Sequence, residues 1–303
     1  MELSTLLQYK PYSTARTEKR ALYAGLLTEL TQFHREHCPE YGRLLDALGC
    51  PAHMDCTVES TPMLPVSLFK ELELRSIPEG EVFKTLTSSG TTGQRVSRIF
   101  LDGATSACQQ QALCQIMSDF LGERRLPFLV LDSRQVLRNR AMFSARGAGI
   151  LGFSIFGTRP CYALDEHMEL DLDGVRAFLE EHQGETIFLF GFTFIIWKHV
   201  VRALEERGER LDIPNGILVH GGGWKKLAGE AVSPGEFKAR VAAATGVERV
   251  SNYYGMAEQT GCIYMECPQG HLHASLWSDI VVRRGRDYRP CEPGEEGVLQ
   301  VLS

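Results

Sequence analysis

The stretch from residue 171 to residue 255 alternates short apolar runs with amphipathic runs, and this alternation constrains the fold more than any other feature. The apolar runs have the length of buried strands, and the amphipathic runs have the length and spacing of helices. We expect strands in 185–191, 216–223 and 247–255 and helices in 173–182, 193–208 and 234–246. Helices between consecutive strands favour a parallel sheet covered on both faces. The sequence therefore predicts an α/β fold with a mostly parallel sheet.

The rest of the chain predicts helices before this region and strands after it. The first 60 residues have a helical pattern and end in a stretch punctuated by prolines. Further elements expected before residue 133 are helices 66–75 and 104–121 and strands 97–102 and 127–132. Beyond residue 260 three strand-like runs follow without helices between them, which indicates a smaller β-rich unit. We therefore expect a helical lead-in (1–60), an α/β body (61–260) and a β-rich unit (261–303).

Composition excludes several classes of protein. The chain has 303 residues, a net charge of -6 and no basic patch typical of nucleic-acid binding, so no nucleic acid is expected as a partner. No apolar run approaches the roughly 20 residues that span a bilayer, and the N-terminus lacks the pattern of a signal peptide. Nine cysteines, scattered without a disulfide-like framework, fit a reducing compartment. We expect a cytoplasmic protein without a membrane span.

A loop rich in serine, threonine and glycine is the sharpest local signal. It runs through Ser88, Ser89, Gly90, Thr91, Thr92 and Gly93. The two glycines let successive N–H groups turn inward as an anion nest, and the hydroxyls add neutral donors for phosphate oxygens. Arg95 and Arg98 follow closely and carry positive charge suited to a polyphosphate. The loop is not a Walker A motif, and an ordinary surface loop of the same composition remains an alternative.

A second polar loop follows the strand expected at the end of the alternating region. It consists of Asn252, Tyr253, Tyr254, Gly255, Met256, Ala257 and Glu258. A tyrosine at a strand end can offer its face to a purine, and the neighbouring glycine permits close approach of the backbone. Glu258 is a candidate ligand for Mg²⁺, which proteins usually hold with one or two carboxylates. By itself the segment also fits an ordinary turn with one exposed acid.

These two loops, with the glycines Gly221, Gly222 and Gly223 between them, resemble the adenylate-forming superfamily of acyl-CoA synthetases, peptide-synthetase adenylation domains and luciferases. In that superfamily a loop like Ser88–Gly93 holds the triphosphate, a glycine turn packs on adenine, and a YGxTE-like segment supplies an aromatic ring and the acid for Mg²⁺. The segment here has Ala257 where threonine is usual, and Gln94-Arg95 replaces the usual Pro-Lys.

Four segments, two of which include the motifs above, narrow the resemblance further to the LuxE-type acyl-protein synthetases. They are HGGGWKKL (220–227), NYYGMAEQTG (252–261), HLHASLWSD (271–279) and GEEGVLQVLS (294–303). The resemblance runs from about residue 60 to the end. It implies the large N-terminal domain of the adenylate-forming fold, with ATP and Mg²⁺ as cofactors and Glu258 as the catalytic and metal-binding residue. It also implies a carboxylic acid substrate, a fatty acid, activated to acyl-AMP and transferred to a protein thiol, with a reductase or acyl carrier as partner.

The resemblance also implies parts that this chain does not contain. The aspartate that holds the ribose, the small C-terminal lid and the acyl-accepting cysteine are expected beyond Ser303. Phe192 and Trp224 are candidates for the wall of the acyl pocket, although each alone also fits a core aromatic residue. An acyl- or aryl-CoA ligase on the same fold and a non-catalytic nucleotide-binding relic remain alternative functions. The sequence identifies neither the acid nor the acceptor nor the oligomeric state.

Two further patterns indicate other kinds of binding site. The run Gly147–Gly152 matches the GxGxxG dinucleotide fingerprint, but it does not lie between an expected strand and helix, so a Rossmann site is disfavoured. Cys262, Cys267, His271 and His273 are of the residue types that bind zinc. Their spacing is not a standard one, and whether they bind zinc remains open.

Overall fold

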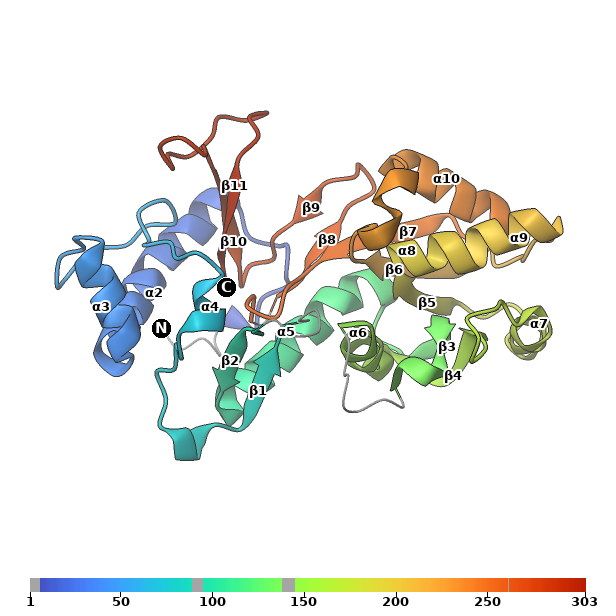
Figure 1. Cartoon of the computed structure of the whole chain (residues 1–303), viewed down its shortest axis with the longest axis horizontal. Coiled ribbons are helices and arrows are strands. Elements are labelled where there is room, and N and C mark those ends of the chain that lie inside the picture. Colours follow the sequence, from blue (N-terminus) through green and yellow to red (C-terminus); the bar gives the residue numbers. More distant parts are fainter. Residues whose placement is uncertain (1–5, 89–94, 138–144, 261) are drawn as a thin grey trace. The chain divides into compact units, whose positions relative to one another are not determined.

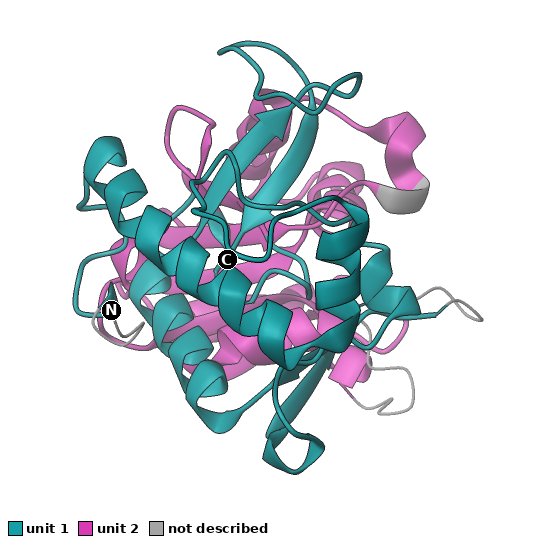
Figure 2. Cartoon of the chain, turned by 90° about the vertical axis from the view of Figure 1, so that its left-hand side faces the viewer, with its two compact units in different colours: residues 1–117, 255–264, 274–303 teal, residues 118–254, 265–273 magenta. Residues whose placement is uncertain are grey.

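The computed structural model describes residues 6–88, 95–137, 145–260 and 262–303. The chain forms two compact units, coloured separately in Figure 2. Unit 1 comprises Met1–Met117, Gly255–Tyr264 and Ala274–Ser303, and unit 2 comprises Ser118–Tyr254 and Met265–His273. Unit 1 therefore joins residues from both ends of the chain, and the helical lead-in shares it with the C-terminal strands.

Unit 2 is built on a seven-stranded sheet in the order β4-β3-β5-β6-β7-β8-β9, labelled in Figure 1. Its strands are β3 (Leu126–Ser133), β4 (Gly157–Leu164), β5 (Ile187–Phe192), β6 (Gly216–Gly221), β7 (Arg249–Tyr254), β8 (Tyr264–Glu266) and β9 (Leu272–His273). In this sheet the pairs β3–β4, β3–β5, β5–β6 and β6–β7 are parallel, and the pair β8–β9 is antiparallel. The mostly parallel sheet predicted from the alternation is confirmed.

The central strands of the sheet are buried on both faces. Every residue of β5 and β6 is buried, as expected for strands covered by helices on both sides. Phe128 of β3 stacks on Phe188 of β5 with a ring-centroid distance of 4.8 Å. Each such fully buried phenylalanine contributes about 1.5–3 kcal/mol to folding through removal of apolar surface from water.

The helices of unit 2 cover both faces of the sheet. They are α6 (Ala145–Phe153), α7 (Leu172–Glu181), α8 (Thr193–Ile195), a π-helical turn (Ile196–Val201), α9 (Arg202–Arg207) and α10 (Pro234–Thr245). Figure 1 shows α6 on one side of the sheet and α9 and α10 on the other. Helix α10 begins where the Ser233 side chain accepts a hydrogen bond from Glu236 N–H. Gly208 and Gly246 end α9 and α10 with φ of 64° and 74°, the left-handed conformation that favours glycine.

Unit 1 contains the N-terminal helices and two separate pairs of strands. Its elements are α2 (Arg16–His37), α3 (Pro39–Ala47), α4 (Leu68–Glu71), β1 (Lys84–Thr87), β2 (Arg98–Leu101), most of α5 (Gly103–Leu121), β10 (Asp279–Arg283) and β11 (Val298–Leu302). Strands β1 and β2 form one antiparallel pair, and β10 and β11 form another. A shared core of α2, the segment after α3 and these C-terminal strands is formed by Tyr23, Leu27, Cys56, Val58, Val281 and Leu302.

Polar contacts reinforce the link between the two ends of the chain in unit 1. The buried Lys19 ammonium of α2 donates to the carbonyl oxygens of Ser275 (2.8 Å) and Ser278 (2.5 Å). Burial lowers the pKa of Lys19, and the nearby Asp279 partly opposes that shift. The Arg283 guanidinium donates to the Glu59 carbonyl at 2.5 Å. These long-range bonds explain why the first helices and the last strands fold as one unit.

Two sequence patterns have plain structural outcomes. The GxGxxG run Gly147–Gly152 lies inside α6, so it is not the strand-to-helix turn of a dinucleotide site, as the sequence indicated. In the part of the chain that the structure describes, no helix is both long and apolar enough to cross a membrane.

Candidate active site

Three neighbouring parallel strands of unit 2 end at the same edge of the sheet. In the register of these strands, Phe192 at the end of β5 lies beside Gly221 at the end of β6, and Gly221 lies beside Tyr253 of β7. The carboxyl edge of such a sheet is where ligands bind in open α/β folds. The loops that begin here are the glycine turn after β6 and the tyrosine segment at the end of β7. Both were predicted as parts of the nucleotide site.

The three glycines of the turn differ in what surrounds them. A Cβ built on Gly221 would lie 2.7 Å from Cζ and 2.8 Å from Cδ1 of Tyr253, so the tyrosine ring covers this glycine. Gly222 has φ of +76°, and its Cβ would lie 3.0 Å from Cδ1 of Phe192. A Cβ on Gly223 would meet no described atom within 4 Å. The fold therefore demands glycine at the first two positions and leaves the third open.

The two adjacent tyrosines of β7 have different environments. The Tyr253 ring packs against Phe153 of α6 at a centroid distance of 5.0 Å, and burial raises the pKa of Tyr253 to about 12. Tyr254 is 39% exposed, the larger exposure expected for alternate residues of a strand. Of the two rings predicted to bind ATP, Tyr254 is exposed and Tyr253 is half-buried.

Asn252 of β7 is held by a buried carboxylate that the sequence did not predict. Its N–H donates to Oε2 of Glu266 at 2.8 Å, and Glu266 pairs with Lys238 of α10 at 3.0 Å between Nζ and Oε1. The Asn252 Oδ1 is buried and has no hydrogen-bond partner among the described residues. The short strand β8 gives no signal from which such a role for Glu266 could be recognised in the sequence.

A threonine and a histidine beside the glycine turn were also missed. Thr193, the first residue of α8, places its Oγ1 3.0 Å from Nδ1 of His220 and 2.9 Å from the Gly222 carbonyl oxygen. Both side chains are buried. The available signals were a threonine at a strand-to-helix junction and a histidine directly before three glycines, and neither pattern is specific.

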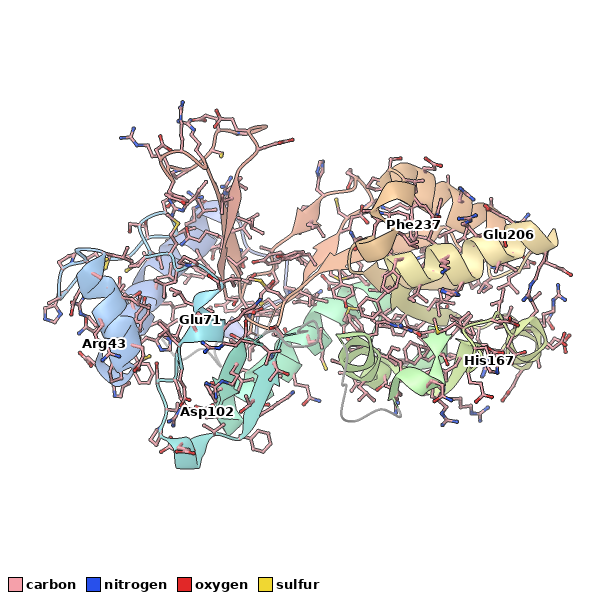
Figure 3. The ribbon with its side chains drawn as sticks, in the orientation of Figure 1. Arg43, Glu71, Asp102, His167, Glu206 and Phe237 are labelled. Atoms are coloured by element: carbon pink, nitrogen blue, oxygen red, sulfur yellow. The ribbon has the colours of Figure 1, made fainter. Side chains whose placement is uncertain are left out.

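The two candidates for an acyl pocket lie on opposite faces of the sheet. Phe192 is 6% exposed and its ring meets Phe190 at 5.9 Å between centroids, on the face covered by α6. Trp224 packs edge-on against Trp197 of the π-helical turn at 5.3 Å, and against Phe237 of α10, which is labelled in Figure 3. Their role in binding an acyl group stays a prediction.

The phosphate-like loop belongs to unit 1, where β1 and β2 form its stem. Ser88 N–H donates to the Ser97 carbonyl at 3.2 Å, and the Ser88 Oγ accepts from Ser97 N–H at 2.9 Å. These bonds close the ends of the loop. The other predicted phosphate ligands, Ser89, Gly90, Thr91, Thr92 and Gly93, lie outside the described residues.

The two arginines after this loop pair with acids near α4. Arg95 contacts Glu71, labelled in Figure 3, at 2.7 Å, and Arg98 lies 3.6 Å from Glu73. All four side chains are exposed, so each pair contributes only about 0–1 kcal/mol. Such weak pairs leave both arginines available to a polyphosphate.

The remaining predicted residues, Gly255, Met256 and Glu258, also belong to unit 1. Gly255 is exposed, and Met256 and Glu258 are half-buried. The Glu258 carboxylate forms no ion pair with any described residue. A half-buried carboxylate without a protein cation fits a ligand of Mg²⁺. Within the described ranges, no group of three or more histidines, cysteines or acids comes together to hold a metal, and this includes the four candidates for zinc.

Comparison with known protein families identifies the family of this chain. The model of the acyl-protein synthetase family, LuxE, matches residues 2–303. The chain belongs to this family. No curated protein sequence matches it. The LuxE resemblance predicted from the sequence is therefore confirmed.

Solved structures show the fold of this LuxE-family chain. A 2-hydroxyisobutyryl-CoA ligase in complex with 2-HIB-AMP and CoA is 18% identical, with a TM-score of 0.67, over 96% of this chain and 61% of that one. A long-chain-fatty-acid-CoA ligase from Archaeoglobus fulgidus is 15% identical, with a TM-score of 0.48, over 86% and 46%. The chain thus spans about 61% of the length of the ligase that it matches with the higher score. Its fold is that of the adenylate-forming ligases, as predicted.

Proposed function

We propose that this chain is the large N-terminal domain of an enzyme that activates a fatty acid with ATP and passes the acyl group to a protein thiol. The family supports acyl activation and transfer in general. The nucleotide site is supported above all by the open space at Gly223. A Cβ atom built on this glycine would have no described atom within 4 Å. Because this open glycine follows a strand end at the carboxyl edge of the parallel sheet, where ligands bind in open α/β folds, it fits close approach of a ligand to the backbone.

In the first step, an oxygen of the fatty-acid carboxylate attacks the α-phosphorus of ATP. The new O–P bond gives acyl-AMP, and the bond between the α- and β-phosphates breaks to release pyrophosphate. In the second step a cysteine thiolate attacks the acyl carbonyl, a thioester forms, and AMP leaves. The carboxylate is already ionised, so the first step needs no general base. It needs charge neutralisation and alignment of the two anions.

The residues predicted from the sequence would meet these needs. Gly221–Gly223 and Tyr254 would receive the adenine, with Asn252, Gly255 and Met256 around it, and the loop from Ser88 to Gly93 would bind the phosphates. Glu258 would hold Mg²⁺, which when bound supplies positive charge beside the phosphate oxygens. Phe192 and Trp224 remain candidates for contact with the acyl chain. None of the nine cysteines forms a disulfide, which supports a cytoplasmic enzyme.

The acyl acceptor decides between this proposal and its alternatives. The full-length protein, given radiolabelled fatty acid, should become labelled only with ATP, and hydroxylamine should remove the label as it does from thioesters. A reductase or acyl carrier would then accept the group. Rapid formation of acyl-CoA after addition of coenzyme A, without labelled protein, would instead identify an acyl-CoA ligase. Absence of turnover with any acid, where ATP binds, would indicate a non-catalytic relic.

Gly223→Ala tests the nucleotide site directly. Because a methyl group there meets open space, the variant should fold as the wild type does while ATP–Mg²⁺ affinity, measured by calorimetry, falls about tenfold. Gly235→Ala is the matched control, since its Cβ is equally unobstructed but lies in α10. Equal affinity of the Gly223→Ala variant and the wild type for ATP would remove the glycine turn from the nucleotide site.

A further inference from the structure

The hydroxyl of Thr193 bridges a buried histidine and the glycine turn. Its Oγ1 lies 3.0 Å from Nδ1 of His220, 2.9 Å from the Gly222 carbonyl oxygen and 3.2 Å from the Gly221 carbonyl oxygen. Thr193 and His220 are 7% and 5% exposed. One side chain at the start of α8 therefore contacts both the last residues of β6 and the turn that follows.

Counting protons fixes the direction of these bonds. The threonine hydroxyl has one proton, and the carbonyl oxygens can only accept, so the hydroxyl donates to the turn, to Gly222 at the shorter distance. The His220 contact must then be a bond in which Nδ1–H donates to Oγ1. This requires the tautomer of the neutral imidazole that carries its proton on Nδ1.

The surroundings of His220 keep that imidazole neutral. Its ring lies 4.6 Å from the Phe237 ring on the face covered by α10. Burial, and secondarily the charge of Lys238 on the same helix, lowers the pKa of His220 to about 3. The histidine is therefore a fixed donor at neutral pH and does not act as an acid or base there.

The far end of the turn is anchored as well. Trp224, the residue after Gly223, packs against Trp197 at 5.3 Å and against Phe237 at 6.2 Å. Arg240 covers the Trp197 ring at 4.3 Å. The turn is thus held at its beginning by hydrogen bonds and at its end by aromatic packing, while Gly223 between them stays open.

We propose that Thr193, oriented by His220, is a positioning residue that holds the Gly221–Gly223 turn in the shape that receives the nucleotide. This inference rests on the proposed function for the identity of the ligand. It assigns to Thr193 no contact with ATP. Its effect passes through the Gly222 carbonyl, so it should affect ATP binding more than the chemical step.

Thr193→Val removes the hydroxyl and keeps the shape, and Thr193→Ser keeps the hydroxyl. In the ligand-free protein, hydrogen exchange of the peptide around 219–224, followed by mass spectrometry, should be about tenfold faster in the valine variant. On the full-length enzyme, the same variant should raise KM for ATP about tenfold and change kcat less than twofold. The serine variant should match the wild type within about twofold in both measurements.

Thr245→Val is the matched control within unit 2. The buried Thr245 hydroxyl donates to the Val241 carbonyl inside α10 at 2.7 Å, so its loss costs a similar bond away from the turn. This control should leave exchange at 219–224 and KM for ATP unchanged. An equal effect of both valine variants would show general destabilisation and overturn the inference.

Two further outcomes separate the inference from the proposed function. Wild-type exchange at 219–224 in a folded Thr193→Val variant, or a serine variant as impaired as the valine variant, overturns the positioning role. If the wild type gives no ATP signal in calorimetry, the proposed function fails and the nucleotide part of the inference fails with it. The exchange comparison needs no ligand, so it still decides whether Thr193 holds the turn.

Discussion

Replacing Gly221 by alanine should destabilise unit 2 by about 1–2 kcal/mol, because the tyrosine ring on the next strand occupies the space of the new methyl group. The Cβ would lie 2.7 Å from Cζ of Tyr253 and 2.8 Å from its Cδ1. Carbon atoms pack best at about 3.5–4.0 Å, so the overlap is on the order of 1 Å. The ring must move or the strand must shift.

The magnitude follows from how little the ring can move. Tyr253 is backed by Phe153 at 5.0 Å and by the buried Phe190 at 6.2 Å between centroids. Overpacking at such a site costs about 1–3 kcal/mol. Alanine also lowers the conformational entropy of the unfolded chain, which stabilises the folded state by about 0.4–1 kcal/mol. The net loss is therefore about 1–2 kcal/mol, and Gly223→Ala, which makes no clash, should be neutral or slightly stabilising.

Urea unfolding followed by circular dichroism measures the difference between these two variants. The Gly221→Ala midpoint should fall with an unchanged slope, and the Gly223→Ala midpoint should stay or rise. In a Tyr253→Ala background the Gly221→Ala penalty should disappear, since the two sites then no longer collide. Equal stabilities of the two alanine variants, or a penalty that persists without the tyrosine ring, would refute the reasoning.

Two predictions concern charge. Glu258→Gln should leave the fold intact, because the carboxylate has no ion-pair partner among the described residues. The same variant should lower acid-dependent pyrophosphate exchange about 10²-fold. Exchange at the wild-type rate would exclude Glu258 as the Mg²⁺ ligand. The pKa of His220 is about 3 in the folded protein, below its value of about 6.5 in the unfolded chain. Between these two values the unfolded chain binds a proton that the folded protein does not bind. The free energy of unfolding should therefore fall by about 1.4 kcal/mol per pH unit as pH drops from 6.5 toward 3. In urea unfolding at pH 4 to 7, the His220→Asn variant should lack this contribution to the pH dependence of stability. An identical pH dependence in the variant and the wild type would contradict the lowered pKa of His220.

The sequence predicted the parts of unit 2 whose signals are local. Buried strands such as β5 and β6 are continuous apolar runs, and Gly208 and Gly246 end their helices in the left-handed conformation that glycine favours. Each of these signals depends only on neighbouring residues. The order of the central strands then follows from the short connections between them.

Strand β4 was not predicted, because it is an edge strand of the sheet and lacks a continuous apolar run. It contains Pro160, which has no N–H to donate, and Arg159 with φ of 46°. Edge strands accept such residues, and only some of the side chains of β4 are buried, so the apolar run that marks a central strand is missing. In unit 1 several helices and strands were predicted locally, but the association of the two ends of the chain was not, since bonds such as Lys19 to Ser275 join residues that are far apart in the sequence.

The glycine turn shows why a motif alone could not define the site. Three identical residues, Gly221, Gly222 and Gly223, stand in a row, and the sequence gives no reason to distinguish them. In the structure the first is required by the Tyr253 ring and the second by its φ of +76° beside Phe192. Of these three glycines, only Gly223 both lacks a positive φ and has a Cβ position that would clash with no described atom. A requirement for glycine there would have to come from a ligand, which is why loss of ATP binding in Gly223→Ala, with stability preserved, would identify the nucleotide site where the other two substitutions could not.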